Sequence, residues 1–413
     1  MSKVNRRTFL KAAGIGGAAV AAVPTVIVKP ARADTIRVGG LHDRTGVIGI
    51  YGNEMADALV FAVDEINAGG GVLGQQLELI EYDAQSTMAN YSQYAQRLAT
   101  ADKADVIFGG ITSASRESIR PVFDRFRKLY FYSTFYEGGV CDRTVFCNAE
   151  TPAQINGPLL KYAMDKFGAK TVYTIAADYI YGQITADWIK KYAKDFGGEV
   201  IAEEFFPLDV GDFASTITKI QQADPDLVVS ALVGGNHIGF YRQWPAAGMQ
   251  DKIPVASTVF GPWENAFVSA EESEGIMCSY HYFQSIDSPA NHAFLEKWRA
   301  RYGADAAEIG TLAICTYNSV NMWKKAVEQA GTIDRMAVIE ALETGISVEG
   351  PGGTVTMDPP THHTIMSAAI AELNGGNFNI VEVAENRTPD DTATVCDLIS
   401  NPDQATQYRI EVD

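Results

Sequence analysis

Beyond its first 33 residues, the sequence has no apolar run long enough to cross a membrane, no CxxC pair and no cluster of histidines. A CxxC pair is the usual signature of a zinc or redox site, so neither site is expected. The adjacent His362 and His363 follow two prolines, and neighbouring side chains point apart on an extended chain. We therefore expect no metal site.

The motifs of catalysis and phosphate binding are also absent. The sequence contains no Walker A loop, Gly-x-Ser-x-Gly elbow, HExxH helix or EF-hand loop. The closely spaced glycines at 14–17 precede no predicted strand. Because neither a nucleophile–base pair nor a cofactor motif can be identified, we expect a protein that is not an enzyme and holds no cofactor.

Cysteines are few, and their number is odd. They are Cys141, Cys147, Cys278, Cys315 and Cys396, so at least one thiol stays free within one chain. Cys141 and Cys147 flank a short loop, and a disulfide between them is one pairing that their spacing allows. Cys315 lies in an apolar helical pattern, where a free cysteine packs as a small hydrophobe.

The N-terminus has the three parts of an export signal. A charged segment with paired arginines, residues 5–11, precedes an apolar run at 12–28, and Ala31-Arg32-Ala33 matches a signal peptidase site. The Arg-Arg-x-Phe-Leu-Lys core resembles the twin-arginine signal, which implies the twin-arginine export machinery as a partner. The sequence therefore predicts cleavage near Ala33, a periplasmic protein and no membrane insertion after cleavage.

The chain is short of positive charge. It contains 33 basic and 51 acidic residues, a net charge of −18. The predicted signal holds six basic residues and no acidic one, so residues 34–413 carry a net charge of −24. Such a chain repels phosphate backbones and anionic lipid head groups, so nucleic acid is not an expected partner.

Apolar segments with strand and helix spacing alternate along the chain, twice over. The first series predicts strands at 35–41, 77–82, 106–110 and 129–132, with helices between them. The second predicts strands at 171–176, 200–206, 227–233 and 254–258. Long helices at 291–302, 308–330 and 335–342 and an extended hairpin at 350–380 follow. This order predicts an α/β protein of two lobes, each a parallel sheet flanked by helices.

Hydroxyl and aromatic side chains gather where predicted strands end. Residues 109–117 follow a buried strand and begin a helix, where Ser113 can cap the helix, bind a ligand or do both. Residues 131–138 follow the next strand and contain Tyr132, Thr134, Phe135 and Tyr136. Tyr179 and Tyr181 follow the first strand of the second series. Ligands bind outside the carboxyl ends of such strands, so these side chains predict a small pocket between the lobes.

Four segments carry a resemblance to a known family. They are Thr-Ser-Ala-Ser-Arg at 112–116, Tyr-Glu-Gly at 136–138, Asp-Tyr-Ile-Tyr at 178–181 and Phe-x-Ser-Ile-Asp-Ser-Pro-Ala at 283–290. Together they resemble the type I periplasmic binding proteins of ABC importers, in particular the branch that binds urea and short-chain amides. The resemblance runs from about residue 36 to beyond 370.

The resemblance implies a two-lobed Venus flytrap with three crossovers between the lobes. Lobe 1 would contain residues 34–152 and about 286–360, and lobe 2 residues 153–285 and about 361–413. Ser113 and Thr134 would offer hydroxyls, and Tyr132 and Phe135 would line the pocket. Tyr179 or Tyr181 would close it from lobe 2.

One position departs from the related branched-chain amino acid binders. There, the positions of Ser113 and Thr134 hold the ligand carboxylate, and an acid from lobe 2 holds the ammonium. Here Trp263 stands where that acid is expected, and Glu264 follows it.

The predicted function is capture of a small polar solute, a short-chain amide or urea, for an inner-membrane ABC permease. Three alternatives remain open at this point. The ligand is an amino acid held by Glu264, or a small organic cation held by aromatic rings that include Tyr136 and Trp263. The third alternative is a periplasmic ligand sensor.

Overall fold

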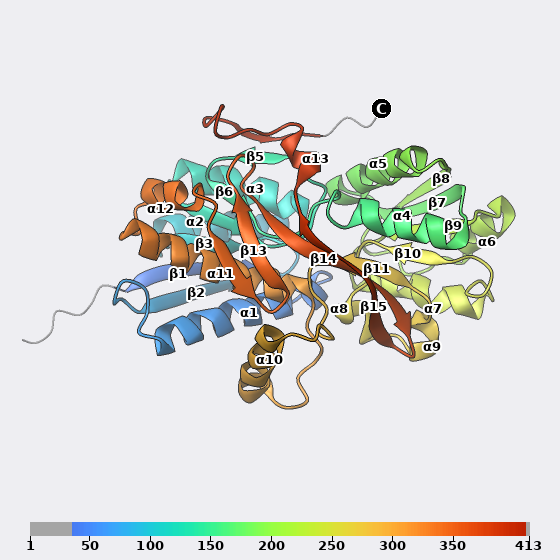
Figure 1. Cartoon of the computed structure of the whole chain (residues 1–413), viewed down its shortest axis with the longest axis horizontal. Helices are drawn as coiled ribbons and strands as arrows, with labels where there is room; N and C mark the ends of the chain where they lie inside the picture. Colours follow the sequence, from blue (N-terminus) through green and yellow to red (C-terminus); the bar gives the residue numbers. More distant parts are fainter. Residues whose placement is uncertain (1–34, 410–413) are drawn as a thin grey trace, which may run out of the picture. The chain divides into compact units, whose positions relative to one another are not determined.

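The computed structural model describes residues 35–409, without the side chain of Asn236 (Figure 1). The predicted export signal and its cleavage site lie outside the described residues. Among those residues, no helix is both long and apolar enough to cross a membrane.

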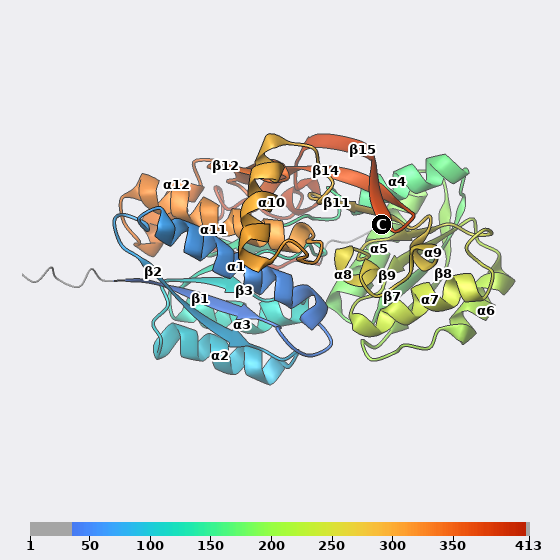
Figure 2. The same cartoon turned by 90° about the horizontal axis from the view of Figure 1, so that it is seen from below.

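Lobe 1 is built on a parallel half-sheet in the order β2-β1-β3-β4-β6. In Figure 2, helices α1 and α11 lie on one face of this half-sheet and α2 and α3 on the other. The antiparallel strands β12 and β13 extend the lobe. Its elements are β1 (Ile36–His42), α1 (Gly49–Ala68), β2 (Leu77–Asp83), α2 (Met88–Thr100), β3 (Val106–Gly109), α3 (Ser113–Arg125), β4 (Leu129–Tyr132), β6 (Val145–Cys147), α10 (Pro289–Tyr302), α11 (Thr311–Ala330), α12 (Arg335–Leu342), β12 (Ser347–Gly350) and β13 (Gly353–Asp358).

Lobe 2 repeats the plan, with its parallel strands in the order β11-β10-β9-β7-β8. Short helices follow β9 and β10 and reach the junction with lobe 1. The elements of lobe 2 are α4 (Asn156–Phe167), β7 (Thr171–Ala177), α5 (Ile180–Asp195), β8 (Glu199–Phe206), α6 (Ala214–Ala223), β9 (Leu227–Ala231), η1 (Gly235–His237), α7 (Ile238–Ala246), β10 (Val255–Ser257), α8 (Pro262–Asn265), α9 (Ala270–Ser273) and β11 (Met277–Tyr280).

One long strand joins the two half-sheets. β14 (His363–Asn374) pairs in parallel with β6 through His363 and Cys147, and then runs antiparallel to β11. β15 (Asn377–Arg387) pairs with its outer edge. The chain thus crosses between lobes after β6, after β11 and along β14, and the predicted α/β fold class is confirmed.

The single hairpin predicted at 350–380 is instead two consecutive hairpins, because β14 pairs antiparallel with both β13 and β15.

The predicted helix periodicity matches the buried faces. In α1, the apolar residues at helical spacing, which include Met55, Leu59 and Ile66, are all buried. Their burial against α11 excludes apolar surface from water, which is the main stabilising contribution to such a layer. Cys315 is buried in α11, as predicted. Local signals set several helix ends, such as the Ser288 cap of α10 and the left-handed Gly331 after α11.

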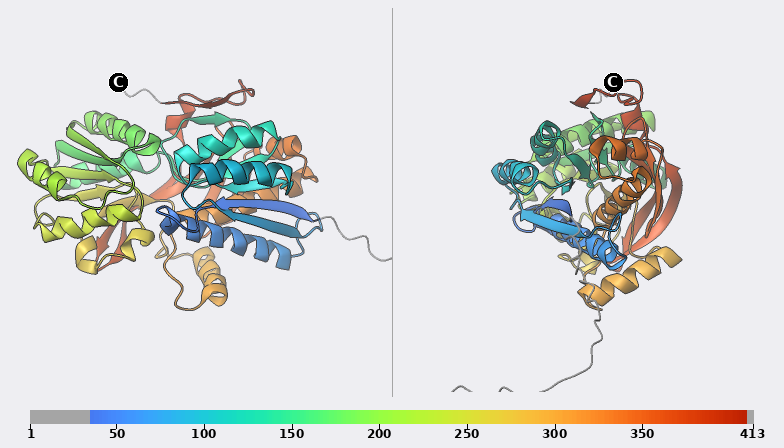
Figure 3. Two further views of the ribbon diagram at one scale, coloured as in Figure 1. Left: turned by 180° about the vertical axis from the view of Figure 1, so that it is seen from behind. Right: turned by 90° about the vertical axis from the view of Figure 1, so that its left-hand side faces the viewer.

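The C-terminal segment returns to lobe 1. After α13 (Asp390–Ala393), strand β16 (Ala405–Gln407) pairs antiparallel with β5 (Val140–Asp142). Figure 3 shows the segment beside the junction of the two lobes. This pairing places β16, which lies in the range of about 361–413 predicted for lobe 2, beside a strand of lobe 1. The predicted lobe boundaries remain a prediction.

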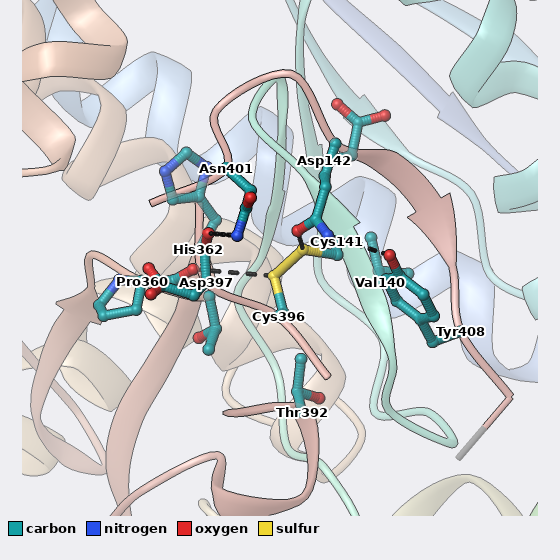
Figure 4. The surroundings of a disulfide bond; sticks show 12 residues. Val140, Cys141, Asp142, Pro360, His362, Thr392, Cys396, Asp397, Asn401 and Tyr408 are labelled. Carbon is teal, nitrogen blue, oxygen red and sulfur yellow. Dashed lines mark hydrogen bonds between the residues drawn. A yellow bond between two sulfur atoms is a disulfide. The ribbon is translucent and has the colours of Figure 1, made fainter. Parts of the chain in front are cut away.

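A disulfide holds this segment, and it is not the one that spacing suggested. Cys141 of β5 bonds to Cys396, 255 residues later in the chain, with their Cα atoms 5.4 Å apart (Figure 4). Cys147 is a buried free thiol. It lies in β6, where its strand partners are Tyr132 of β4 and His363 of β14. The strand geometry therefore separates the two cysteines that are neighbours in sequence.

Candidate functional site

A cavity lies between the lobes, at the carboxyl ends of the parallel strands. Lobe 1 contributes side chains from α1, from the β3–α3 and β4–β5 connections and from α11. Lobe 2 contributes side chains that follow β7, β9 and β10. The lining residues are Tyr51, Ile111, Thr112, Ser113, Tyr132, Thr134, Phe135, Tyr179, Tyr181, Val233, Val259 and Leu312.

Six of the nine predicted site residues line this cavity, and three do not. The structure brings together Ser113, Tyr132, Thr134, Phe135, Tyr179 and Tyr181. Tyr136, Trp263 and Glu264 lie behind the lining. The ring of Tyr136 stacks on His363 inside lobe 1, and its hydroxyl accepts from the Val140 N–H at 3.1 Å. The aromatic cage predicted for an organic cation therefore lacks two of its rings here.

Two glycines bring the chain from β3 into the cavity wall. Gly109 and Gly110 have φ values of 149° and 76°, which favour glycine. A Cβ on Gly109 would lie 2.1 Å from the Leu41 carbonyl oxygen. Helix α3 then starts with Thr112, whose side chain accepts from the Ser115 N–H at 3.1 Å. Because Thr112 caps the helix, the hydroxyl of Ser113 is left for another contact.

Ser113 makes that contact with a buried carboxylate. Its hydroxyl donates to Glu137 Oε2 at 2.5 Å, and Glu137 is fully buried. Glu137 Oε1 accepts from Arg116 Nη2 at 2.9 Å. Since the proton of Ser113 is directed at Glu137, its oxygen is left to accept a hydrogen bond from a ligand.

Arg116 is a fully buried cation held between aromatic rings. Its guanidinium carbon lies 4.9 Å from the ring centre of Tyr132 and 4.5 Å from that of Tyr136. Its Nε donates to Glu117 at 2.9 Å. Burial opposes the charge, but Glu137 and the other groups around it hold the pKa of Arg116 well above its usual range. The ion pair of Arg116 and Glu137 thus lies behind Ser113, a residue of the cavity lining.

The other polar groups of the lobe 1 wall differ in the strength of the hydrogen bonds that they make within the protein. The Tyr132 hydroxyl donates to the Ile111 carbonyl at 2.6 Å, which fixes that ring. The Thr134 hydroxyl makes two long contacts, 3.4 Å to the Gly110 carbonyl and 3.8 Å to Met55 sulfur, and it also interacts with the side chain of Tyr132. Long bonds are weak, so the fold holds the Thr134 hydroxyl only loosely.

Two tyrosines form the polar part of the lobe 2 wall. The Tyr181 hydroxyl lies 3.0 Å from Thr258 Oγ1. The Tyr179 hydroxyl has no hydrogen-bond partner among residues 35–409, and its ring lies 6.1 Å from that of Tyr181. Burial raises the pKa of Tyr179 well above its usual value, so its hydroxyl stays protonated and can donate.

Glu264, the acid considered for an ammonium, is occupied by neighbours. Its Oε1 accepts from the Tyr51 hydroxyl at 2.8 Å and lies 3.0 Å from His237 Nε2, and its Oε2 accepts from the Gly261 N–H at 2.8 Å. Burial raises the pKa of Glu264, and the hydrogen bond from His237 opposes that rise. Tyr51 lines the cavity and Glu264 does not. The carboxylate of Glu264 is therefore connected to the cavity lining through the hydroxyl of Tyr51.

Trp263 also supports the lining from behind. Its indole N–H donates to the Val259 carbonyl at 3.0 Å. Its ring meets that of Tyr51 edge-on, with the centres 5.7 Å apart. Trp263 thus helps to hold Tyr51 and Val259 at the cavity wall.

The lining, in the described part of the chain, contains no charged side chain. Its polar residues carry hydroxyls, and the rest of the surface is aromatic and aliphatic. Burying an ion without a counter-charge is costly. A charged ligand would therefore meet no counter-charge among the side chains of this lining.

Sequence reasoning missed Tyr51 and the aliphatic lining. Tyr51 follows the loop after β1, the first strand of lobe 1, and begins α1. The rule that ligands meet the carboxyl ends of strands applies to this loop as well, so a signal for it existed. Val233, Val259 and Leu312 carried no such signal, because isolated aliphatic residues are indistinguishable from core.

The histidine pair is structural. The Nδ1 N–H of His363 donates to the Thr361 carbonyl at 2.8 Å, and burial lowers the pKa of His363 to about 3. His362 stacks on Phe146 and contacts Glu343 at 3.2 Å. Among residues 35–409, no group of three metal-ligating side chains is brought together.

Comparison with known proteins identifies the family. A family model described as "Periplasmic binding protein domain" matches residues 36–394. The Leu/Ile/Val-binding protein homolog 6 of Brucella melitensis is 23% identical over 362 residues, covering 85% of this chain and 91% of that protein. The leucine-, isoleucine-, valine-, threonine- and alanine-binding protein of Pseudomonas aeruginosa is 25% identical over 332 residues, covering 79% and 86%.

Solved structures share the fold. The branched-chain amino acid transporter substrate binding protein LivJ of Streptococcus pneumoniae, in complex with isoleucine, has a TM-score of 0.76 at 23% identity and covers 85% of this chain and 100% of that one. A solute binding protein of an ABC transporter from Rhodopseudomonas palustris, in complex with 3,4-dihydroxybenzoic acid, has a TM-score of 0.75 at 21% identity, with 86% and 98% covered. At these identities the likeness describes the fold alone.

Proposed function

Because this chain belongs to the periplasmic binding protein family, it is a solute-binding protein, and we propose that its ligand is urea or a short-chain amide. The bound solute is delivered to an inner-membrane ABC permease. The observation that carries the proposal is the uncharged, hydroxyl-bearing lining of the cavity between the lobes.

An uncharged amide has both hydrogen-bond donors and an acceptor, and each needs a partner once it is buried. An unpaired buried polar group costs about 1–3 kcal/mol. The cavity offers Ser113 as an acceptor, since its proton is given to Glu137. It offers Thr134 and Tyr179 as hydroxyls with few or no bonds of their own. This mixture matches an amide group and its carbonyl oxygen.

An amino acid is the second candidate, and one observation favours it. The carboxylate of Glu264 is separated from the cavity by the hydroxyl of Tyr51, at 2.8 Å. A movement of Tyr51 would give an ammonium group access to this carboxylate. The Brucella relative is named for leucine, isoleucine and valine, and the Pseudomonas relative binds, by its name, these three amino acids together with threonine and alanine.

Isothermal titration calorimetry of residues 34–413 separates the two candidates. We expect heat of binding with urea, acetamide or formamide, and none with leucine. Glu264→Gln should keep amide binding, because the amide side chain can still accept from Tyr51. Tight binding of leucine, abolished by Glu264→Gln and without any heat from the amides, would replace this proposal by the second candidate.

A matched threonine pair tests the cavity itself. Thr134→Val should weaken amide binding about tenfold, because the ligand loses one hydrogen bond in a dry site. Thr218→Val on the exposed face of α6 is the control, since its hydroxyl bonds only to the Ala214 carbonyl. Equal affinities of the two variants would argue against the cavity as the ligand site.

Export by the twin-arginine machinery and cleavage near Ala33 are part of the proposal. Replacing Arg6 and Arg7 by lysine should retain the full-length precursor in the cytoplasm, as judged by cell fractionation and immunoblotting. Unchanged periplasmic yield would show that another route exports the protein.

A further inference from the structure

The C-terminal segment, residues 395–409, lies beyond the part of the chain that matches the family model, which ends at residue 394. It is nevertheless attached firmly to lobe 1. Cys396 is bonded to Cys141, and β16 pairs with β5 so that Thr406 faces Cys141 and Gln407 faces Val140. The Tyr408 N–H adds a bond to the Gly139 carbonyl at 2.7 Å.

The side chain of Gln407 reaches the buried ion pair behind the cavity. Its Oε1 accepts from Arg116 Nη2 at 2.5 Å. Its Nε2 donates to the Gly138 carbonyl at 2.8 Å and lies 3.4 Å from Glu137 Oε1. Gln407 therefore holds both members of the pair and the backbone next to one of them.

The ion pair has few other polar contacts to rely on. Arg116 Nη1 is buried and has no hydrogen-bond partner among the described residues. The remaining bond of Arg116 outside the pair goes to Glu117. Removing Gln407 would leave Nη2 with Glu137 alone and would open a route for water to a pair whose two members are fully buried.

The ion pair of Arg116 and Glu137 also orients Ser113, a residue of the cavity lining. Glu137 Oε2 takes the proton of Ser113, and Ser113 lines the cavity. A chain of hydrogen bonds thus runs from Gln407 through Glu137 to Ser113. Buried networks of this kind are sensitive to the loss of any member, because each group depends on its neighbours for satisfaction.

We propose that residues 405–409 form the rear wall of the ligand site, tethered through the Cys141–Cys396 disulfide, and that Gln407 is a positioning residue that acts on the ligand through Glu137 and Ser113. The inference rests on the proposed function only in taking the cavity as the ligand site. The identity of the ligand does not enter it.

The test is a double-mutant cycle, with acetamide as the probe in isothermal titration calorimetry of residues 34–413. Gln407→Ala should weaken acetamide binding about tenfold, because Ser113 loses its fixed orientation. In a Ser113→Ala background, the same change should alter affinity by less than about twofold. An equal loss in both backgrounds, or no loss in either, would overturn the proposal.

Gln404→Ala is the matched control. Gln404 is the same residue type in the same segment, and its Nε2 donates to the Tyr408 hydroxyl at 3.0 Å rather than to the ion pair. Its replacement should leave acetamide affinity within about twofold of the wild type. A loss as large as that of Gln407→Ala would indicate a general loosening of the segment and not a specific relay.

A ligand-independent measurement keeps the two proposals separable. In hydrogen–deuterium exchange of the unliganded protein, Gln407→Ala and the pair Cys141→Ser/Cys396→Ser should speed exchange at residues 112–118 and 136–142 relative to wild type and Gln404→Ala. Failure of the wild type to bind acetamide, with this exchange pattern present, would count against the amide ligand alone. Unchanged exchange at both segments would overturn the role of the rear wall.

Discussion

Two buried carboxylates lie directly behind the lining of the cavity between the lobes, one in each lobe, and their charges are balanced differently. Glu137 in lobe 1 faces the permanent cation of Arg116 at 2.9 Å. Glu264 in lobe 2 faces His237 at 3.0 Å and the hydroxyl of Tyr51 at 2.8 Å. Both are fully buried, and each touches one lining residue, Ser113 or Tyr51.

The difference separates a fixed part of the site from an adjustable one. An arginine keeps its charge at any ordinary pH. The lobe 1 ion pair therefore keeps the hydroxyl of Ser113 in the same orientation as pH changes. Glu264 has no such partner, and burial raises its pKa. It also meets a side chain of lobe 1, since Tyr51 belongs to α1. The lobe 2 carboxylate therefore combines a contact between the lobes with a dependence on pH.

Glu137→Gln should have the largest effect of the changes considered. It removes the fully buried counter-charge of Arg116 and leaves only the partly exposed Glu117, which costs about 3–5 kcal/mol of unfolding free energy. Differential scanning calorimetry would measure the loss. Glu117→Gln is the control, because Glu117 bonds the same arginine from a partly exposed position. Equal losses for the two variants would contradict the fixed buried pair.

Tyr51→Phe should have the next largest effect. It removes one hydroxyl that donates to Glu264 at 2.8 Å and accepts from the Gly234 N–H at 3.0 Å. Leaving these buried groups unpaired should lower the free energy of unfolding by about 1–3 kcal/mol. Tyr82→Phe, which removes a partly buried bond to Asp102, is the control for calorimetry. A cost no greater than that of the control would mean that the contact between the lobes contributes little.

Glu264→Gln should change how stability depends on pH. Because the pKa of Glu264 is raised on folding, the folded state binds this proton more tightly than the unfolded state. Its contribution is complete below the pKa of the unfolded chain and is lost as pH rises through the folded pKa. The loss is about 1.4 kcal/mol for each pH unit that separates the folded and unfolded pKa values.

The measurement is the melting temperature from about pH 4 to about pH 9, a range that brackets the ordinary and the raised pKa of a carboxyl group. Glu264→Gln should lose less stability than the wild type as pH rises, and Glu271→Gln, on the exposed helix α9, should follow the wild type. Parallel curves for wild type and Glu264→Gln would refute a raised pKa as the distinguishing feature of the lobe 2 carboxylate.

Tyr179→Phe should have the smallest effect on the fold. The hydroxyl has no hydrogen-bond partner among residues 35–409, so stability should stay within about 0.5 kcal/mol of the wild type. Amide affinity should nonetheless fall, because the hydroxyl is free to bind ligand. A stability loss comparable to that of Tyr51→Phe would show that the fold uses this hydroxyl.

Local patterns predicted much of the cavity lining. Ser113 and Thr134 each follow a short buried strand, and parallel strands bring their carboxyl ends to one edge. The same rule predicted Tyr179 and Tyr181 in lobe 2. Trp263 and Glu264 were predicted at the cavity, but α8 turns Trp263 behind Val259 and directs Glu264 to Tyr51. Side-chain direction in a four-residue helix depends on what packs against it, so spacing alone does not reveal it.

Partners far apart in sequence were beyond prediction. The Cys141–Cys147 pairing rested on proximity along the chain, whereas Cys141 bonds to Cys396. The contact of Arg116 with Gln407 joins residues 291 positions apart. No short-range periodicity records which distant segment a strand such as β5 will pair with.

The sequence by itself determined the two βα series, the α/β fold class and the hydroxyl and aromatic segments at the strand ends, because periodicity and turn residues act over a few neighbours. Only the tertiary structure decided that Tyr51 screens Glu264, that Glu137 takes the proton of Ser113, and that the C-terminal segment holds Arg116. These are contacts of buried polar groups, each of which must find a partner wherever the fold provides one. The identity of that partner is a property of the packed chain.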